Sequence, residues 1–189
     1  LDPGMTALAR EFAPLRALNG AALDDRRVRI VNDDAMHWLE SPDGIYDLVI
    51  ADFPDPNSFA LGKLYTTRFY GLVQGCLAPD GAIAVQSTSP LFARQAYWCI
   101  VHTLEASGLS ARPYHIAVPS FGEWGFVLAS RREFAIPAIA PAGLAHLDGP
   151  AMAAMFVLGP AMGPLPVEPN RLNNQILVRY YEEEWRRLD

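Results

Sequence analysis

The sequence predicts an α/β domain with a mainly parallel sheet, helices on both of its faces and an antiparallel hairpin at its C-terminal end. Short runs of β-branched and apolar residues alternate along the chain with longer segments of helical periodicity. Clusters of Gly, Pro, Asn and Asp separate these segments, as is typical of turns. The alternation indicates helical crossovers between parallel strands, and the last two strands follow each other with only PSFGE between them.

The chain begins with helical spacing of apolar residues over 3–22, with Asp2 as the cap and Pro3 as the first helical residue. Pro14 lies inside this segment and is expected to kink or divide the helix. The elements expected after it are a strand over 28–31, a helical turn over 34–39, a turn over 41–44 and a buried strand over 46–51.

The rest of the chain divides where its composition changes. The elements expected first are a helix over 65–77, a turn over 79–81, a strand over 82–86, a helix from Ser89 to Gly108, and strands over 112–118 and 125–129. From residue 131 the chain is rich in Ala and Pro, before a helical end, NRLNNQILVRYYEEEWRRLD. We therefore expect one domain over residues 1–130 and a Pro/Ala-rich extension over 131–189 that packs on it.

Composition and charge exclude some classes of function. The 189 residues, 51% of them apolar, suffice for one sizeable core. The formal net charge of −6 argues against nucleic acid as a partner, because phosphate binding needs a basic face, and it suits a cationic substrate. Cys76 and Cys99 lack disulfide or zinc spacing, which favours buried thiols in a reducing compartment. The histidines show no metal-ligand spacing, so no metal is predicted.

The longest apolar tract, residues 151–166, is broken by Gly and Pro, so it is not expected to cross a bilayer as one helix. No signal peptide is visible. We therefore expect a soluble, cytoplasmic fragment without membrane contact. The chain begins at Leu1 without an initiator Met, which suggests that residues upstream have been left out.

Polar side chains follow three of the predicted strands at the edge where parallel strands end. They are Asp33 and Asp34, Asp52 and Asp55, and Gln86 and Ser87. Ligands of open parallel sheets collect at this edge, because several loops and helix N-termini converge there. A single Asp in such a position is explained at least as well by a helix cap or a solvated loop. The three groups together favour a site.

Carboxylates at such an edge suit two kinds of chemistry, metal binding or the holding of a cation while a proton is taken from it. Metal fits less well, because the DFPDP stretch is embedded in prolines and aromatics with no histidine close in sequence. An aliphatic ammonium has a pKa near ~10.4, the value for lysine, and is no nucleophile until a base takes its proton. One carboxylate as anchor and another as proton acceptor would serve a polyamine or a similar substrate.

Aromatic residues surround this region, and most of them are expected to be core residues. Phe121 and Trp124 are the exceptions that we favour, since SFGEWG is a loop with two large rings and one acid. We expect it near the same sheet edge, where the rings would line a channel for an alkyl amine.

Several motifs together carry a resemblance to a known family. They are, in order, NDDAMHWL, YDLVIADFPDP, LYTTRFY, LAPDGAIAVQSTSP and PSFGEWGF. With them, residues 1 to about 130 resemble the polyamine aminopropyltransferases, the spermidine synthase family. The tail, with NRLNNQILVRYYEEEW, resembles an extended bacterial branch of that family. Some members of this branch carry transmembrane segments before the catalytic domain, so anchoring of the full-length protein to the inner membrane stays open.

The resemblance implies a fold and a reaction. The fold would be a Rossmann-like sheet of the class I methyltransferase type, with residues 1–130 as the catalytic domain. The reaction would transfer an aminopropyl group from decarboxylated S-adenosylmethionine, the co-substrate, to putrescine, forming spermidine and methylthioadenosine. The implied partners are a small polyamine and a nucleoside, with no further cofactor and no metal. A homodimer is left open.

The resemblance also implies roles for individual residues. Asp52 matches the family's proton acceptor, and Asp55 matches the second acid, which holds the amine. Gln86 matches a glutamine that faces the amine site. Asp34 and Ala35 match the pair beside the adenine of the nucleoside.

The sequence departs from the family pattern in several positions. The Gly-rich motif, the strand before it and the N-terminal β-hairpin domain are absent, so we expect a fragment that starts inside the nucleotide-binding fold. Pro119 stands where the family has a tyrosine for the amine, and NSFALGK replaces the usual GP after the DP. The identity of the amine therefore stays open.

Two other functions compete with aminopropyl transfer. One is an S-adenosylmethionine-dependent methyltransferase on the same fold, because DFPDP is distantly similar to the (D/N)PP(Y/F) loop of amino-methyltransferases. The other is a non-catalytic module that binds polyamines. Turnover of decarboxylated S-adenosylmethionine and of S-adenosylmethionine distinguishes the two enzymes, and a binding module would form no product from either.

Overall fold

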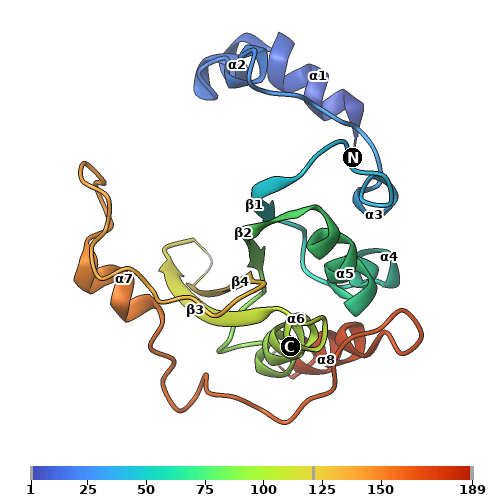
Figure 1. Cartoon of the computed structure of the whole chain (residues 1–189), viewed down its shortest axis with the longest axis vertical. Helices are drawn as coiled ribbons and strands as arrows, with labels where there is room; N and C mark the ends of the chain where they lie inside the picture. Colours follow the sequence, from blue (N-terminus) through green and yellow to red (C-terminus); the bar gives the residue numbers. More distant parts are fainter. Residues whose placement is uncertain (1, 121, 188–189) are drawn as a thin grey trace. The chain divides into compact units, whose positions relative to one another are not determined.

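The computed structural model describes residues 2–120 and 122–187 (Figure 1). The chain forms two compact units, Leu1–Ser41 and Pro42–Asp189. Residues 42–130 and the extension from residue 131 belong to the same unit. The boundary at residue 130 that composition suggests stays a prediction.

The first unit carries short helices, among them α1 (Pro3–Glu11) and α2 (Ala13–Leu18). The Asp2 carboxylate caps α1 by accepting a hydrogen bond of 2.8 Å from the Gly4 N–H. Pro14 lies in the first turn of α2, where its missing N–H is not needed. The expected division of the helix is therefore confirmed. A 3₁₀ turn, Ala22–Asp24, and α3 (Ala35–Trp38) follow.

The expected strand over 28–31 is wrong, because this segment has no strand conformation. A strand needs the backbone groups of a neighbour, and in the described part of the chain these residues enter no ladder. Local bonds form instead. The Val28 N–H donates to the Asp25 carbonyl (2.8 Å), and the Asp25 carboxylate accepts from the Arg27 N–H (2.8 Å).

The second unit is built on a mixed sheet of four strands in the order β1-β2-β4-β3. The strands are β1 (Tyr46–Ala51), β2 (Leu77–Gln86), β3 (Ser110–Val118) and β4 (Gly122–Ser130). β1 and β2 are parallel, whereas β4 is antiparallel to both β2 and β3. The expected strand over 46–51 and the expected antiparallel hairpin are both confirmed.

Two details of the sheet differ from the expectation. The 46–51 strand is not buried: Leu48 and Ile50, which lie on the same face of β1, are 55% and 70% exposed. The turn expected over 79–81 lies inside β2, where an irregular register brings Leu77 opposite Tyr46 but Ala82 opposite Leu48. The turn residues thus form a bulge in the strand and do not precede it.

The second unit also contains helices. They are α4 (Phe59–Gly62), a 3₁₀ turn over Lys63–Tyr65, α5 (Thr67–Cys76), α6 (Arg94–Ala106), α7 (Gly149–Met155) and α8 (Ile176–Trp185). α6 begins later than expected, because the Ser89 hydroxyl accepts from the N–H groups of Leu91 and Phe92 (3.3 Å each) and closes a turn there. Gly108, with φ +86°, follows the end of α6 as expected.

The core lies between the sheet and the helices α5, α6 and α8. Its fully buried side chains include Phe69, Val73, Ile83, Val85, Ile100, Leu104, Val127 and Leu177. Cys76 and Cys99 are also buried and are not paired with each other, as the sequence predicts. Burial raises the pKa of the Cys99 thiol to about 12.

The extension packs along one face of α6. Residues 94, 98 and 102 share this face because they are four apart. Their side chains bond to backbone carbonyls of the extension: Arg94 Nε donates to Gly163 O (2.7 Å) and Trp98 Nε1 to Met162 O (2.9 Å), while His102 Nδ1 lies 3.2 Å from Val167 O. A segment with little regular structure is held in this way by three side chains of one helix.

Buried Asn170 joins the extension to the 3₁₀ turn before α5. Its backbone N–H donates to the Thr103 hydroxyl (2.8 Å). Its side-chain Nδ2 donates to the carbonyls of Gly62 (2.9 Å) and Tyr65 (3.2 Å), and its Oδ1 accepts from the Leu177 N–H (3.3 Å). One amide therefore fixes the backbone at Tyr65 and the start of α8 together.

α8 in turn supplies the cap of α6. The Glu184 carboxylate is buried and accepts from the backbone N–H groups of Gln95 (2.7 Å) and Ala96 (3.1 Å). Ala93, the residue at the N-cap position, has no side chain that could do so. Burial raises the pKa of the Glu184 carboxyl, and the two backbone donors act in the opposite direction.

A close backbone approach joins the end of β2 to β4. The Gly125 N–H donates to the Thr88 carbonyl (2.6 Å), and its own carbonyl accepts from the Ser87 N–H (2.9 Å). A Cβ atom on Gly125 would lie 2.5 Å from the Tyr97 ring and 2.7 Å from Thr88 O. Only glycine fits there without a shift of its neighbours.

In the part of the chain that the structure describes, no helix is long and apolar enough to cross a membrane.

We expect Glu184→Ala to lower the free energy of unfolding by about 1–2 kcal/mol, because it leaves two helix N–H groups without their acceptor. Urea unfolding measures the loss. Glu183→Ala on the exposed side of the same helix is the control and should change stability by less than about 0.5 kcal/mol. Equal effects of the two substitutions would contradict the capping role.

We expect Gly125→Ala to lower the free energy of unfolding by about 1–3 kcal/mol, because the new methyl group overlaps Tyr97 and Thr88. Gly71→Ala is the matched control. Gly71 lies in α5, and a Cβ atom added to it would have no neighbour within 4 Å, so alanine there should raise stability by about 0.5–1 kcal/mol. Thermal or urea unfolding of both variants checks the difference in sign.

Candidate active site

A pocket of about 660 Å³ opens where β1 and β2 end and β4 begins. It is lined by Asp52, Phe53, Pro54, Asp55, Gln86, Val118, Trp124 and Phe126. The topology explains why residues so far apart in sequence meet. The carboxyl ends of parallel β1 and β2 share one edge, and antiparallel β4 has its first residues there, with Phe126 opposite Gln86. Four residues that the sequence selects, Asp52, Asp55, Gln86 and Trp124, therefore line one pocket.

The Asp55 carboxylate is the most densely bonded group of the pocket. Its Oδ1 accepts from Gln86 Nε2 at 3.0 Å. Its Oδ2 accepts from the Tyr181 hydroxyl at 2.9 Å and from the Thr88 hydroxyl at 3.4 Å. Asp55 is half-buried, whereas Asp52 is exposed at the same pocket.

Gln86 is held from its other end by Tyr65. The Tyr65 hydroxyl lies 3.2 Å from Gln86 Oε1 and also within reach of the carbonyls of Pro54 (3.1 Å) and Phe53 (3.3 Å). This donor at Oε1 directs the amide Nε2 of Gln86 toward Asp55. Burial raises the pKa of Tyr65, and the charges of Asp55 and Asp52 raise it further, so the hydroxyl keeps its proton and stays a donor.

Tyr181 is a second tyrosine that bonds to a residue of the pocket, and the sequence does not single it out. It comes from α8 in the extension, 126 residues after Asp55. Burial raises its pKa, and so does the neighbouring Asp55 charge. The sequence assigns the tail no more than packing, and nothing local in RYYEEEW separates Tyr181 from Tyr180. Tyr181 differs from Tyr180 only in its spacing, since it lies four residues after Leu177 and three before Glu184 and so shares the buried side of the helix with them.

Thr88 reaches Asp55 from an unfavourable backbone conformation. It has φ +59°, a left-handed value that β-branched residues rarely adopt, and it is fully buried. The bonds to Gly125 described above hold the backbone in this shape. Strained residues of this kind cluster at functional sites, because only a firmly packed surrounding keeps them in place.

Aromatic rings form the walls around the carboxylates. Phe53 packs edge-on against Tyr65 and Phe69, with ring centroids 6.1 Å and 5.6 Å apart. Trp124 and Phe126 line the pocket from β4. Trp124 is therefore in the region that the sequence predicts for it, whereas Phe121 lies outside the described residues.

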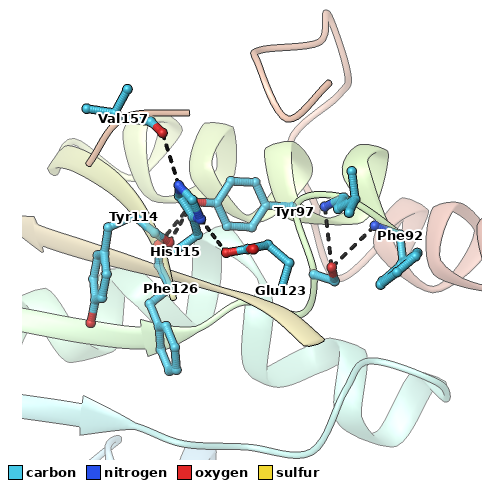
Figure 2. Close-up of polar contacts among 9 residues, drawn as sticks. Phe92, Tyr97, Tyr114, His115, Glu123, Phe126 and Val157 are labelled. Atoms are coloured by element: carbon cyan, nitrogen blue, oxygen red, sulfur yellow. Dashed lines mark hydrogen bonds and ion pairs between the residues drawn. The ribbon is translucent and has the colours of Figure 1, made fainter. Parts of the chain in front are cut away.

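The β3–β4 hairpin that carries Trp124 is braced from two sides (Figure 2). The Tyr97 hydroxyl lies 3.1 Å from the carbonyls of both Tyr114 and Phe126, one on each strand. On the other side, His115 bonds through Nδ1 to the Glu123 carboxylate and through Nε2 to the Val157 carbonyl (3.0 Å). Figure 2 shows the imidazole between these partners. The wall is thus tied both to α6 and to the segment after α7.

Asp34 and Ala35 belong to the first unit. The Asp34 carboxylate caps α3 by accepting from the N–H groups of Met36 (2.9 Å) and His37 (3.3 Å), and Ala35 is the first residue of that helix. The helix-cap interpretation therefore holds for Asp34 as a local fact. The predicted role beside a nucleoside stays a prediction.

Within the described part of the chain, no cluster of His, Cys, Asp and Glu side chains has the arrangement of a metal site. The donors around Asp55 are an amide and two hydroxyls. What the pocket offers is two carboxylates with aromatic walls, a combination suited to a small organic cation.

Comparison with known proteins agrees with this geometry. A spermine/spermidine synthase domain matches residues 1–137. Polyamine aminopropyltransferase 2 of Ralstonia nicotianae is 47% identical over 187 residues, and polyamine aminopropyltransferase of Leptospira interrogans is 45% identical over 188 residues. These matches cover 98% and 100% of this chain but 37% and 38% of the two relatives. The chain thus spans less than half the length of these curated relatives.

Solved structures show the same fold. A spermidine synthase in complex with the transition-state analogue AdoDATO superposes with a TM-score of 0.70 at 21% identity, covering 84% of this chain and 56% of that one. The spermidine synthase of Thermotoga maritima also gives 0.70, at 20% identity, with 84% and 55% covered. The α/β fold of the methyltransferase type that the sequence predicts is confirmed. With the domain match and the relatives, this shows that the chain belongs to the spermine/spermidine synthase family.

Proposed function

We propose that the protein transfers an aminopropyl group from decarboxylated S-adenosylmethionine to a diamine such as putrescine, forming spermidine and methylthioadenosine. The observation that carries the proposal is that Asp52, Asp55 and Gln86 line one pocket with aromatic walls. Its shape and charge suit an aliphatic diamine, whose ammonium needs a carboxylate and whose methylene groups need apolar contact. The relatives named polyamine aminopropyltransferase support the same reaction.

Asp55 is proposed to hold the amine and Asp52 to receive its proton. An aliphatic amine with a pKa near ~10.4 enters as an ammonium and becomes a nucleophile only after it loses a proton. In the transfer, the nitrogen lone pair forms a bond to the methylene carbon beside the sulfonium. The C–S bond breaks, its electron pair stays on sulfur, and the proton from nitrogen goes to the Asp52 carboxylate. Much of the rate should come from the alignment of amine, carbon and sulfur.

The other site residues are assigned from the same proposal. Gln86 holds Asp55 and borders the amine, and Trp124 contributes the wall along the alkyl chain. Asp34 and Ala35, at the start of α3, would border the adenine of the co-substrate. Residues 1–130 would form the catalytic domain, and residues 131–189 would form the extension packed on it.

The proposed partners are a polyamine and a nucleoside, both small molecules, and the net charge of −6 disfavours nucleic acid. A cytoplasmic location agrees with the two buried, unpaired thiols. Self-association as a homodimer and attachment of a longer protein to the inner membrane are further proposals, which size measurement and membrane fractionation would test.

We expect Asp52→Asn in the full-length protein to lower kcat by about 10²–10⁴-fold, because the amide cannot take a proton from the amine. Release of methylthioadenosine measures the rate, and the KM for the amine should change much less than kcat. Wild-type turnover in this variant would remove Asp52 from the proposed chemistry.

We expect Asp55→Asn to act mainly on the amine, because the neutral amide no longer attracts the ammonium. The KM for the amine should rise by about 10-fold or more, the value of a charge-assisted hydrogen bond, with the KM for the nucleoside little changed. Steady-state kinetics with each substrate varied in turn make this distinction. An equal rise in both KM values would contradict an amine-specific role.

A direct comparison of the two nucleosides tests the reaction itself. Decarboxylated S-adenosylmethionine should give methylthioadenosine and spermidine, and S-adenosylmethionine should give no methylated amine. Methyl transfer would identify an ordinary methyltransferase, and amine binding without product from either nucleoside would identify a non-catalytic module.

A further inference from the structure

The extension contributes a side chain to the most densely bonded carboxylate of the pocket. The Tyr181 hydroxyl lies 2.9 Å from Asp55 Oδ2, which is the shortest of the three hydrogen bonds that this carboxylate receives in the described part of the chain. Tyr181 does not line the pocket itself. Its contact with the site is therefore made through Asp55.

The three donors restrict the orientation of the Asp55 carboxylate. An ionised carboxylate has about four acceptor positions, and Gln86, Thr88 and Tyr181 occupy three of them. Bonds to both oxygens prevent rotation of the carboxylate plane. About one position remains for a donor that comes from the pocket. A single N–H of an ammonium group fits this remaining position.

α8 is held near both of its ends, and this fixes the position of Tyr181. Leu177 is fully buried, and its N–H bonds to Asn170 Oδ1 (3.3 Å). Glu184, at the other end of α8, bonds to the start of α6. Tyr181 lies between these two attachments, four residues after Leu177 and three before Glu184 on the same side of the helix. A donor fixed in this way orients its acceptor.

We propose that Tyr181 is a positioning residue for the amine substrate, acting through Asp55: its hydroxyl fixes the carboxylate so that one oxygen position faces the pocket and binds the terminal ammonium of a diamine. This inference rests on the proposed aminopropyl transfer. It assigns the extension a part in substrate binding as well as in packing. The strained Thr88 supplies the second donor to the same oxygen, which indicates that the orientation of Asp55 is maintained against a local cost in backbone energy.

The test compares Tyr181→Phe with Tyr180→Phe in the full-length protein. Both variants remove one hydroxyl from adjacent positions of α8 and keep the ring. The Tyr180 hydroxyl lies 3.5 Å from the Glu168 N–H and has no part in the pocket, so Tyr180→Phe is the matched control. We expect Tyr181→Phe to raise the KM for putrescine by about 10-fold, with kcat and the KM for decarboxylated S-adenosylmethionine changed by less than about threefold. Tyr180→Phe should leave all three constants near the wild-type values.

A double-mutant cycle with Asp55→Asn separates positioning from a structural effect. If Tyr181 acts through the Asp55 carboxylate, adding Tyr181→Phe to Asp55→Asn should raise the KM for putrescine by less than about twofold beyond Asp55→Asn alone. A tenfold effect in that background would overturn the inference. So would equal kinetics of Tyr181→Phe and Tyr180→Phe in a wild-type protein that forms spermidine. If the wild-type protein forms no methylthioadenosine with any diamine, the proposed function is wrong, and the inference about Tyr181, which rests on it, is wrong as well.

Discussion

The pocket depends on a carboxylate that is held by neutral donors. Asp55 receives its hydrogen bonds from one amide and two hydroxyls, those of Gln86, Thr88 and Tyr181. A lysine or arginine in their place would orient the carboxylate as well, but it would also neutralise the charge that an incoming cation needs. Neutral donors fix the geometry of the carboxylate and leave its negative charge available to the proposed amine. A buried polar network is stable when each of its donors and acceptors has a hydrogen-bond partner. Residues from three separate parts of the second unit supply these partners to Asp55.

The fold brings each donor to Asp55 by a separate route. The parallel pairing of β1 and β2 sets Gln86 beside the loop that carries Asp55. The close approach of Gly125 to the end of β2 holds the turn at Thr88. Asn170 and Glu184 anchor α8 and thereby Tyr181. The last two routes share α6, whose Tyr97 bonds to β4 and whose start receives the Glu184 cap. A change in α6 should therefore reach the pocket without touching it.

The sequence predicted those parts of the site that follow from local pattern. The strand over 46–51 and the two aspartates after it stand next to each other in the chain, so periodicity and turn residues suffice to find them. The strand expected over 28–31 failed because strand formation depends on a partner that local composition does not reveal. The exposure of Leu48 and Ile50 was missed for a related reason, since an apolar run does not say whether other elements cover both faces of its strand. Tyr181 was out of reach because its contact spans 126 residues.

The different surroundings of the two aspartates favour different roles for them. A proton taken up by Asp55 would occupy an oxygen that already accepts hydrogen bonds, so at least one of the three donors would lose strength or have to turn away. Turning away is costly for Tyr181, whose helix is anchored at both ends, and for Thr88, whose backbone is already strained. Asp52 is exposed to water at the same pocket. The cost of disturbing the hydrogen bonds of Asp55 therefore supports the proposed division, with Asp55 as the anchor and the exposed Asp52 as the proton acceptor.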